Sequence, residues 1–321
     1  RCGKPVNELW TNLGPEVINI SYTGSRSIIH RVIQIDFSSI SAFLTGFSTY
    51  PQPLRLRLRI FTIFFLYKQT HQTVRKGELS TIMKLVFDKA DLVKSVGIAM
   101  KAVSGKTTMP ILECILIDAS SNVIKFTSND MELGIETIVT GMILERGIVA
   151  LDAKIFSEIV RKLPDNQVTI ETDENLVTTI TCEKAKFNIP GQSGEDFSYL
   201  PILETSDCVS ISQFTLKELI RQTIFSIAAN ENNKLMTGEL FEIKDNTLRV
   251  VSLDGHRIAI RRIELKDSYP DRKVVVPGKT LNEISKILSG EMDDQIDIYF
   301  SENHIMFKFD DTTVVSRLID G

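Results

Sequence analysis

The sequence contains few of the residues that bind metal ions or cross-link secreted domains. Its four cysteines are Cys2, Cys114, Cys182 and Cys208, and its four histidines are His30, His71, His256 and His304. The cysteines are too far apart for a CxxC zinc or redox motif or for a disulfide-dense scaffold, and the histidines show no metal-ligand spacing. The sequence therefore predicts a protein of the reducing cytoplasm that holds no metal or other cofactor.

Long apolar runs are also missing. The longest uncharged apolar stretch, residues 60–67, has eight residues, whereas a membrane-spanning helix needs about 20. Yet 43% of the 321 residues are hydrophobic, which is enough for at least two packed cores. We therefore expect a globular protein with no membrane partner.

The net charge of −4 conceals a division of the chain at Met83. Residues 1–82 carry ten basic and four acidic residues and ten of the 24 aromatic residues, so the remainder carries a net charge of −10. Only residues 54–60 alternate strictly, which is typical of a basic edge strand or of an arm for nucleic acid or a membrane surface. We favour a third interpretation: residues 1–82 are translated upstream sequence, and the protein begins at Met83. Lys76, Gly77 and Glu78 can be encoded by the kind of purine run that recruits bacterial ribosomes.

From Met83 onward a pattern of one strand, one helix and three strands recurs. It occurs twice before residue 191 and twice after residue 207, and VALDAKIFSEIVRKL in the first half reappears as VVVPGKTLNEISKIL in the second. Residues 250–254 repeat residues 126–130 at an offset of 124. Four βαβββ units predict an α+β fold with two similar domains, 83–206 and 207–321, joined by a linker at 191–207.

The four predicted helices, 90–103, 153–163, 215–228 and 279–288, carry an excess of positive charge. They hold nine basic and four acidic residues, a net +5, whereas the rest of the chain after Met83 carries −15. The basic residues are Lys94, Lys101, Lys154, Arg161, Lys162, Lys217, Arg221, Lys279 and Lys286. Exposed helix faces often hold lysine, but its repetition on four helices of an acidic chain indicates a layer that attracts phosphate.

The sequence contains only incomplete matches to enzyme motifs. Gly105-Lys106-Thr107 and Gly278-Lys279-Thr280 end like a phosphate-binding loop, but both lack the glycine required five residues earlier. Asp254 and His256 could serve a hydrolase, although no nucleophile accompanies them, and an Asp-Gly pair between alternating strands is typical of a hairpin turn.

Several segments resemble the bacterial DNA polymerase III β subunit, the sliding clamp. They are SGKTTMPIL, FTSNDMELGIE, GIVALDAKIFSEIVRKLP, FNIPGQSGEDFSYLP, VSLDGHRIAI and VVVPGKTLNEISKIL, within a match over residues 83–321. The resemblance implies a DNA clamp fold whose helices line a hole around double-stranded DNA, with the sheets outside. It also implies a non-catalytic subunit of the polymerase holoenzyme. In replication such a subunit tethers the replicative polymerase, and the polymerase and the clamp loader bind it through short linear motifs.

The resemblance also assigns residues. DNA contacts fall on Lys106, Arg161 and Lys279. The groove for partner peptides falls on Met236, Leu253, Gly255, His256, Arg257 and Ile258. For Met236 and Ile258, ordinary core packing is the competing interpretation.

The family has three domains per protomer and a ring of two protomers, whereas this sequence ends after the second domain. We therefore expect the third domain to be absent. Two alternatives stay open beside the hydrolase: a two-domain clamp that closes as a trimer, and a non-functional fragment of a clamp.

Overall fold

A computed structural model describes residues 82–105, 107–203, 208–229 and 233–320. These residues belong to one compact unit, Glu78–Gly321. The interpretation of residues 1–82 as translated upstream sequence lies outside the described residues, apart from Ile82, and Lys106 also lies outside them.

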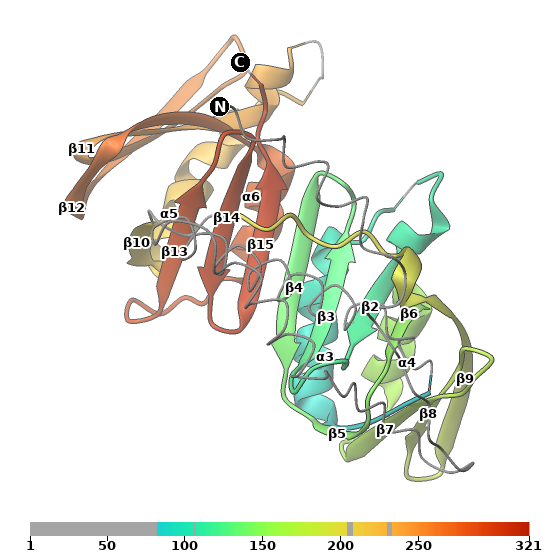
Figure 1. Ribbon diagram of the computed structural model, residues 1–321. Coiled ribbons are helices and arrows are strands. Elements are labelled where there is room, and N and C mark those ends of the chain that lie inside the picture. Colours follow the sequence, from blue (N-terminus) through green and yellow to red (C-terminus); the bar gives the residue numbers. More distant parts are fainter. Residues whose placement is uncertain (1–81, 106, 204–207, 230–232, 321) are drawn as a thin grey trace, which may run out of the picture. The chain divides into compact units, whose positions relative to one another are not determined.

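The first half of the unit, residues 83–203, is called the first repeat (Figure 1). Its strands are β1 (Met83–Asp88), β2 (Cys114–Asp118), β3 (Ile124–Asn129), β4 (Leu133–Val139), β5 (Met142–Glu145), β6 (Ile148–Asp152), β7 (Gln167–Thr172), β8 (Val177–Cys182) and β9 (Ala185–Ser193). Its α-helices are α3 (Lys89–Ala99), which continues as the short helix η4 (Met100–Ala102), and α4 (Ala153–Lys162). The side chain of Asp152 caps α4 by accepting a hydrogen bond from the N–H of Ile155 at 2.8 Å.

The second repeat comprises residues 208–320. Its strands are β10 (Cys208–Ser212), β11 (Gly238–Leu253), β12 (Ile258–Pro277), β13 (Gln295–Phe300), β14 (His304–Phe309) and β15 (Thr312–Arg317). Its α-helices are α5 (Gln213–Thr223) and α6 (Gly278–Ile287), and α5 is followed by the short helices η7 (Ile224–Ser226) and η8 (Lys234–Thr237).

Two details of the predicted pattern are wrong. The short strands expected in the third and fourth units are merged into β11 and β12, which pair from Gly238–Pro277 to Leu253–Ile258 with register shifts around Asp245. The linker begins later than the predicted residue 191, because residues 191–193 belong to β9 and pair with β6. Gly191 permits that pairing, since a Cβ there would lie 2.6 Å from Cγ2 of Val149.

Thirteen strands from both repeats join in one antiparallel sheet, and β11 and β12 form a second sheet of two strands. Strand β15 of the second repeat pairs with β4 of the first, from Thr312–Thr137 to Ser316–Leu133. Leu133 and Ile135 on β4 belong to the hydrophobic core of the second repeat. The junction between the repeats is therefore held by main-chain hydrogen bonds and by a shared core.

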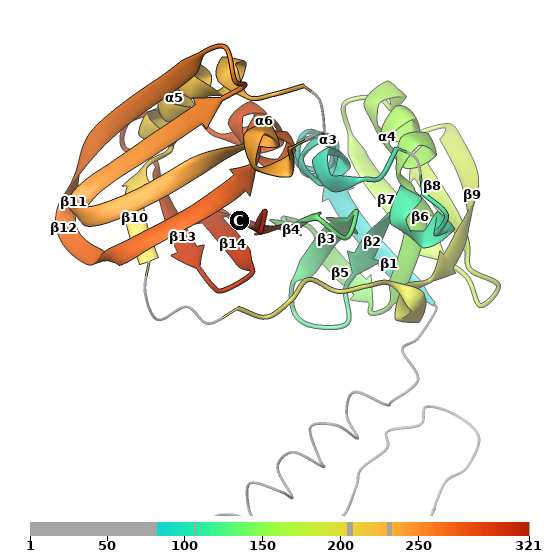
Figure 2. The same cartoon turned by 90° about the horizontal axis from the view of Figure 1, so that it is seen from above.

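All four α-helices lie on one side of the strands (Figure 2). In the first repeat, Phe126 on β3 packs against Phe87 on β1 and Phe156 on α4, with ring centroids 6.0 and 6.1 Å apart. Burial of such side chains contributes about 25 cal/mol per Å² of apolar surface. The predicted arrangement, with helices on one face and antiparallel strands on the other, is confirmed. Among the described helices, none is long and apolar enough to cross a membrane.

Candidate functional site

Four basic side chains in the helical layer of the first repeat have no partner among the described residues. Lys94 is on α3, Lys101 is on η4, and Lys154 and Arg161 are on α4. Within each pair the residues are seven apart, or about two helical turns and 10 Å. Across the described ranges, none of the four forms an ion pair or a side-chain hydrogen bond, and α3 and α4 lie against each other. This group is called the cationic face.

The other basic residues of the four α-helices are already bound within the protein. Arg221 holds both carboxylate oxygens of Glu218, at 2.8 and 2.7 Å. Lys286 contacts Glu283 at 2.5 Å, and Lys217 donates to the carbonyl oxygen of Leu288 at 2.9 Å. Lys162 pairs with Glu158 at 3.8 Å, and Lys279 pairs with Asp130. Among the described residues of the α-helices and η4, the unpaired basic side chains are thus confined to the first repeat.

Lys279, on α6, crosses the junction between the repeats. Its ammonium group contacts a carboxylate oxygen of Asp130, whose side chain is only 5% exposed. The other oxygen of Asp130 accepts hydrogen bonds from the main-chain N–H groups of Glu132 and Leu133, at 3.0 and 2.7 Å. In this structure Lys279 therefore links the two repeats, a role that the sequence did not indicate.

We expect Lys279→Met to lower the melting temperature by about 2–4 °C, since it leaves the enclosed Asp130 without its cation, a loss on the order of 1 kcal/mol. Lys154→Met is the matched control, because Lys154 has no partner among the described residues. Calorimetry of the two variants measures the difference. Equal melting temperatures would show that the Lys279 ion pair does not stabilise the junction.

The hairpin between β11 and β12 is organised by Asp254. One carboxylate oxygen accepts hydrogen bonds from the main-chain N–H groups of His256 and Arg257, at 3.0 and 3.1 Å. The other accepts a hydrogen bond from Nε of Arg257 at 2.8 Å. The N–H of His256 and the guanidinium group of Arg257 hold the pKa of Asp254 below its usual range. Gly255 has a φ of 89°, a conformation that favours glycine. Asp254 thus shapes a turn and contacts the main chain of His256, which does not suit a hydrolase that needs it to orient the imidazole.

Apolar side chains are exposed around this hairpin. Leu253 and Ile258 are cross-strand partners, and Ile258 is 60% exposed, so core packing does not explain it. The guanidinium group of Arg257 lies 5.9 Å from the ring centroid of Phe225 on η7. Half-buried Met236 accepts a hydrogen bond on its carbonyl oxygen from the N–H of Ala228 at 2.8 Å.

The hairpin thus brings five of the six predicted groove residues together, and Met236 follows on η8, which contacts β11. Sequence reasoning missed Phe225, Leu235 and Ile260, which are 57%, 42% and 52% exposed. The alternation of Ile258 and Ile260 on β12 places both on one face and could have identified Ile260.

Two repeats that each pack a pair of α-helices against antiparallel strands, with one sheet continuous across both repeats and cations on the helical side, define a DNA clamp. The DNA polymerase III β subunit matches both repeats: its N-terminal domain over residues 83–201 and its central domain over residues 210–321. The chain belongs to the DNA polymerase III β subunit family, the β sliding clamps.

The named relatives of this chain are also β sliding clamps or DNA polymerase III β subunits. The chain is 37% identical over 249 residues to the β sliding clamp of Bacillus subtilis, covering 74% of this chain and 65% of that protein. It is 36% identical over 250 residues to that of Halalkalibacterium halodurans, covering 74% and 66%. A crystal structure of a putative DNA polymerase III β subunit from Eubacterium rectale is 69% identical with a TM-score of 0.73, covering 74% and 66%. A crystal structure of the DNA polymerase sliding clamp from Bacillus subtilis is 36% identical with a TM-score of 0.72, covering 75% of this chain and 65% of that chain. The chain spans about two thirds of the length of these relatives.

Proposed function

We propose that this chain acts as a sliding clamp, or processivity factor, that encircles double-stranded DNA and tethers the replicative DNA polymerase during chromosome replication in the cytoplasm. The observation that carries the proposal is the cationic face, whose four positive charges have no partner in the part of the chain that the structure describes, while the remaining charge after Met83 is strongly negative. We further propose two domains, 83–206 and 207–321, within a homo-oligomeric ring, and a role as a non-catalytic subunit of the polymerase holoenzyme.

The cationic face suits the DNA backbone rather than the bases. Lysine and arginine side chains on exposed helical turns can neutralise phosphates, whereas base reading requires an element inserted into a groove. Binding by phosphate contacts is independent of sequence and weakens steeply as salt displaces the protein. Such binding allows a clamp to move along DNA.

Two unrelated 30-base-pair duplexes should bind the chain with the same affinity, and for each the logarithm of the binding constant should fall linearly with the logarithm of the salt concentration. Fluorescence anisotropy between 25 and 200 mM salt measures both quantities. A strong preference for one duplex, or a binding constant insensitive to salt, would argue against a backbone-binding clamp.

The hairpin of the second repeat provides the proposed groove for the polymerase and the clamp loader. Leu253, Ile258 and Met236 offer apolar contacts, and His256 and Arg257 offer polar contacts beside them. Such a surface suits short linear motifs, which bury a few apolar anchors in a groove. This groove lies on the second repeat, whereas the cationic face lies on the first.

A linear peptide from the polymerase should therefore bind near Met236, and Ile258→Asp should reduce its affinity at least tenfold because a carboxylate would replace an apolar contact. Ile202→Asp is the matched control, since Ile202 is 93% exposed in the segment between β9 and β10. Isothermal titration measures both affinities, and the duplex affinity should change little in either variant. If Ile258→Asp binds the peptide normally, the groove has been assigned to the wrong residues.

A further inference from the structure

The turn between β3 and β4 in the first repeat has the same construction as the hairpin of the second. Asp130 accepts hydrogen bonds from N–H groups two and three residues ahead, as does Asp254. The next residue has a positive φ in both turns, 74° at Met131 and 89° at Gly255. The offset of 124 residues between the sequence repeats relates the same two turns. The first repeat thus carries a structural counterpart of the hairpin beside the proposed groove.

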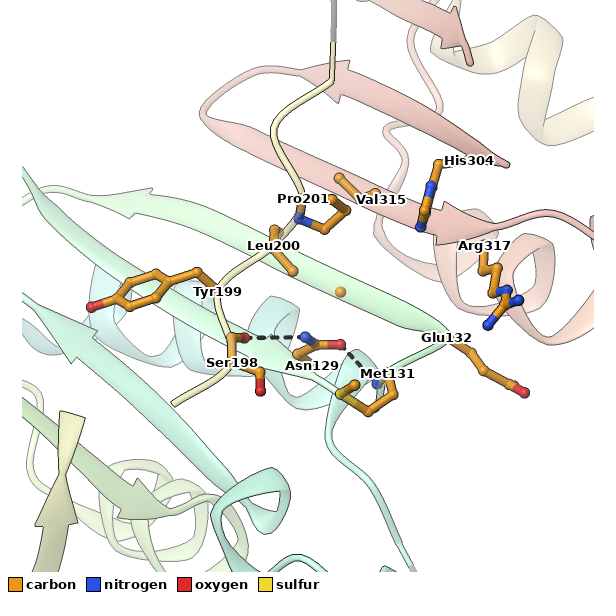
Figure 3. Close-up of a pocket in the computed structure, with 11 residues that line it drawn as sticks. Asn129, Met131, Glu132, Ser198, Tyr199, Leu200, Pro201, His304, Val315 and Arg317 are labelled. Carbon is orange, nitrogen blue, oxygen red and sulfur yellow. Dashed lines mark hydrogen bonds between the residues drawn. The ribbon is translucent and has the colours of Figure 1, made fainter. Parts of the chain in front are cut away.

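A cavity of about 270 Å³ lies beside this first turn (Figure 3). One wall comes from the turn and the start of β4, a second from the connecting segment at residues 198–201, and a third from β14 and β15 of the second repeat. Its lining includes Met131, Leu200, Pro201, Val315, His304 and Arg317. The cavity can accommodate one or two small side chains, but not a whole folded partner.

The connecting segment is seated firmly against the turn. Nδ2 of Asn129 donates to the carbonyl oxygen of Ser198 at 3.1 Å, and Oδ1 of Asn129 accepts the N–H of Met131 at 2.8 Å. Leu200 lies over Gly134, so closely that a Cβ on that glycine would be 2.0 Å from Cδ2 of Leu200. The side chain of Asn129 and the contact of Leu200 with Gly134 therefore hold residues 198–201 against the turn. These residues form a fixed wall of the cavity.

The opposite wall combines an apolar side chain with an imidazole and a cationic guanidinium group. His304 on β14 and Arg317 on β15 are cross-strand partners, with Val315 two residues from Arg317. In the described part of the chain neither the imidazole nor the guanidinium group has an ion-pair or hydrogen-bond partner. Glu132 also lines the cavity, but its carboxylate points away from residues 198–201 in Figure 3. The cavity therefore favours a ligand with an apolar group and a nearby negative charge.

We propose that this cavity is a second peptide site, which binds a short linear segment of a partner protein through an aliphatic side chain and an adjacent carboxylate. The aliphatic group lies among Met131, Pro201 and Val315, and the carboxylate pairs with Arg317. The site is separate from the hairpin groove, and it does not depend on DNA binding.

Methionine methyl groups test the site in the full chain. Met131 is 58% exposed and reports on the cavity, whereas Met236 reports on the hairpin groove. The protein is labelled with ¹³C at its methionine methyl groups, the two signals are assigned with Met131→Leu and Met236→Leu, and acetyl-Leu-Glu-Leu-amide is titrated. The Met131 signal should shift saturably. Acetyl-Leu-Gln-Leu-amide, which lacks the charge, should bind at least fivefold more weakly.

The exposed Arg317 supplies the decisive variant. Arg317→Gln should weaken binding of the acidic peptide about tenfold as read at Met131, whereas Arg272→Gln, at an exposed position on β12, should leave it unchanged. The proposal is overturned if Met131 does not respond, if only Met236 responds, or if Arg317→Gln binds like the unaltered protein.

Discussion

Reversing the four unpaired charges of the cationic face should abolish most of the DNA binding. The variant is Lys94→Glu, Lys101→Glu, Lys154→Glu and Arg161→Glu. Each lost phosphate contact lowers the slope of the salt dependence by about 0.9, so the slope should fall by roughly 3 to 4, and the affinity at about 50 mM salt should fall at least 100-fold. The four side chains are exposed or half-buried, so the fold should be retained. Fluorescence anisotropy gives the affinity, and circular dichroism monitors the fold.

A control variant in the same helical layer distinguishes the effect of where a charge lies from the effect of the net charge. Glu218→Gln with Arg221→Gln removes an ion pair of α5 and leaves the net charge unchanged. Since this arginine is already neutralised, the control should bind DNA nearly as well as the unaltered protein. A large loss in the control, or none in the reversed variant, would show that the unpaired cations do not form the DNA contact.

Single variants distinguish the residues assigned by resemblance. Arg161→Glu should weaken DNA binding more than Lys279→Glu does, because Arg161 is unpaired among the described residues and Lys279 is paired with Asp130. Lys106 remains a predicted contact and can be tested as Lys106→Glu in the same assay. An equal loss for Arg161→Glu and Lys279→Glu would mean that DNA displaces Asp130 from Lys279.

Replacing Glu239 should stabilise the protein in alkaline solution by the largest amount of any single change we expect. Glu239 on β11 is fully buried, and neither carboxyl oxygen has a hydrogen-bond partner among the residues that the structure describes. Burial raises the pKa of Glu239 from 4.5 to about 8. The nearby hydroxyl group of Thr223 offsets only part of this rise in the pKa. Its hydrogen is donated to the carbonyl oxygen of Leu219 at 2.7 Å.

The sign of the pH dependence follows from this shift. The unfolded chain releases the proton of Glu239 near pH 4.5, whereas the folded chain retains it until about pH 8. The free energy of unfolding therefore falls as the pH rises between these values, by up to about 1.4 kcal/mol per pH unit. Glu239→Met should remove that fall and raise the melting temperature at pH 8 by roughly 5–10 °C.

Glu242 on the same strand provides a control, because the pKa of its carboxyl group is shifted in the opposite direction. Its hydrogen bond to Lys273 and the positive charge of Arg249 lower the pKa of its carboxyl group, so its contribution to stability is lost as the pH falls. Glu242→Gln should therefore leave the alkaline loss of stability intact. Melting curves between pH 5 and 9 measure both variants. If Glu239→Met melts like the unaltered protein at pH 8, Glu239 has a partner that keeps it ionised.

The helices were predictable because their signals are local. Asp152 and Ser212 cap α4 and α5 through hydrogen bonds to N–H groups three residues ahead, and the apolar positions repeat with helical spacing. The merging of strands in β11 was not predictable in the same way. Asp245 and Asn246 are turn formers, and the structure accommodates them as a shift of register with Asp245 at a φ of 53°.

The charge count predicted a cationic helical layer but not which charges are available. The pairs Glu218–Arg221 and Glu283–Lys286 are three residues apart and could have been found from their spacing. The pair of Lys279 and Asp130 joins residues 149 apart, and only the folded junction reveals it. The cavity beside Met131 was missed for the same reason, since its walls come from distant segments.

The most direct test of a clamp that binds DNA through its helices is lysine acetylation with and without a 30-base-pair duplex, quantified by mass spectrometry at low salt. Lys94, Lys101 and Lys154 should lose reactivity when DNA is added. Lys125 and Lys308 should retain theirs, because each alternates with buried neighbours on its strand and lies on the sheet face opposite the helices. Protection of Lys125 and Lys308, with full reactivity at Lys94, Lys101 and Lys154, would contradict the account.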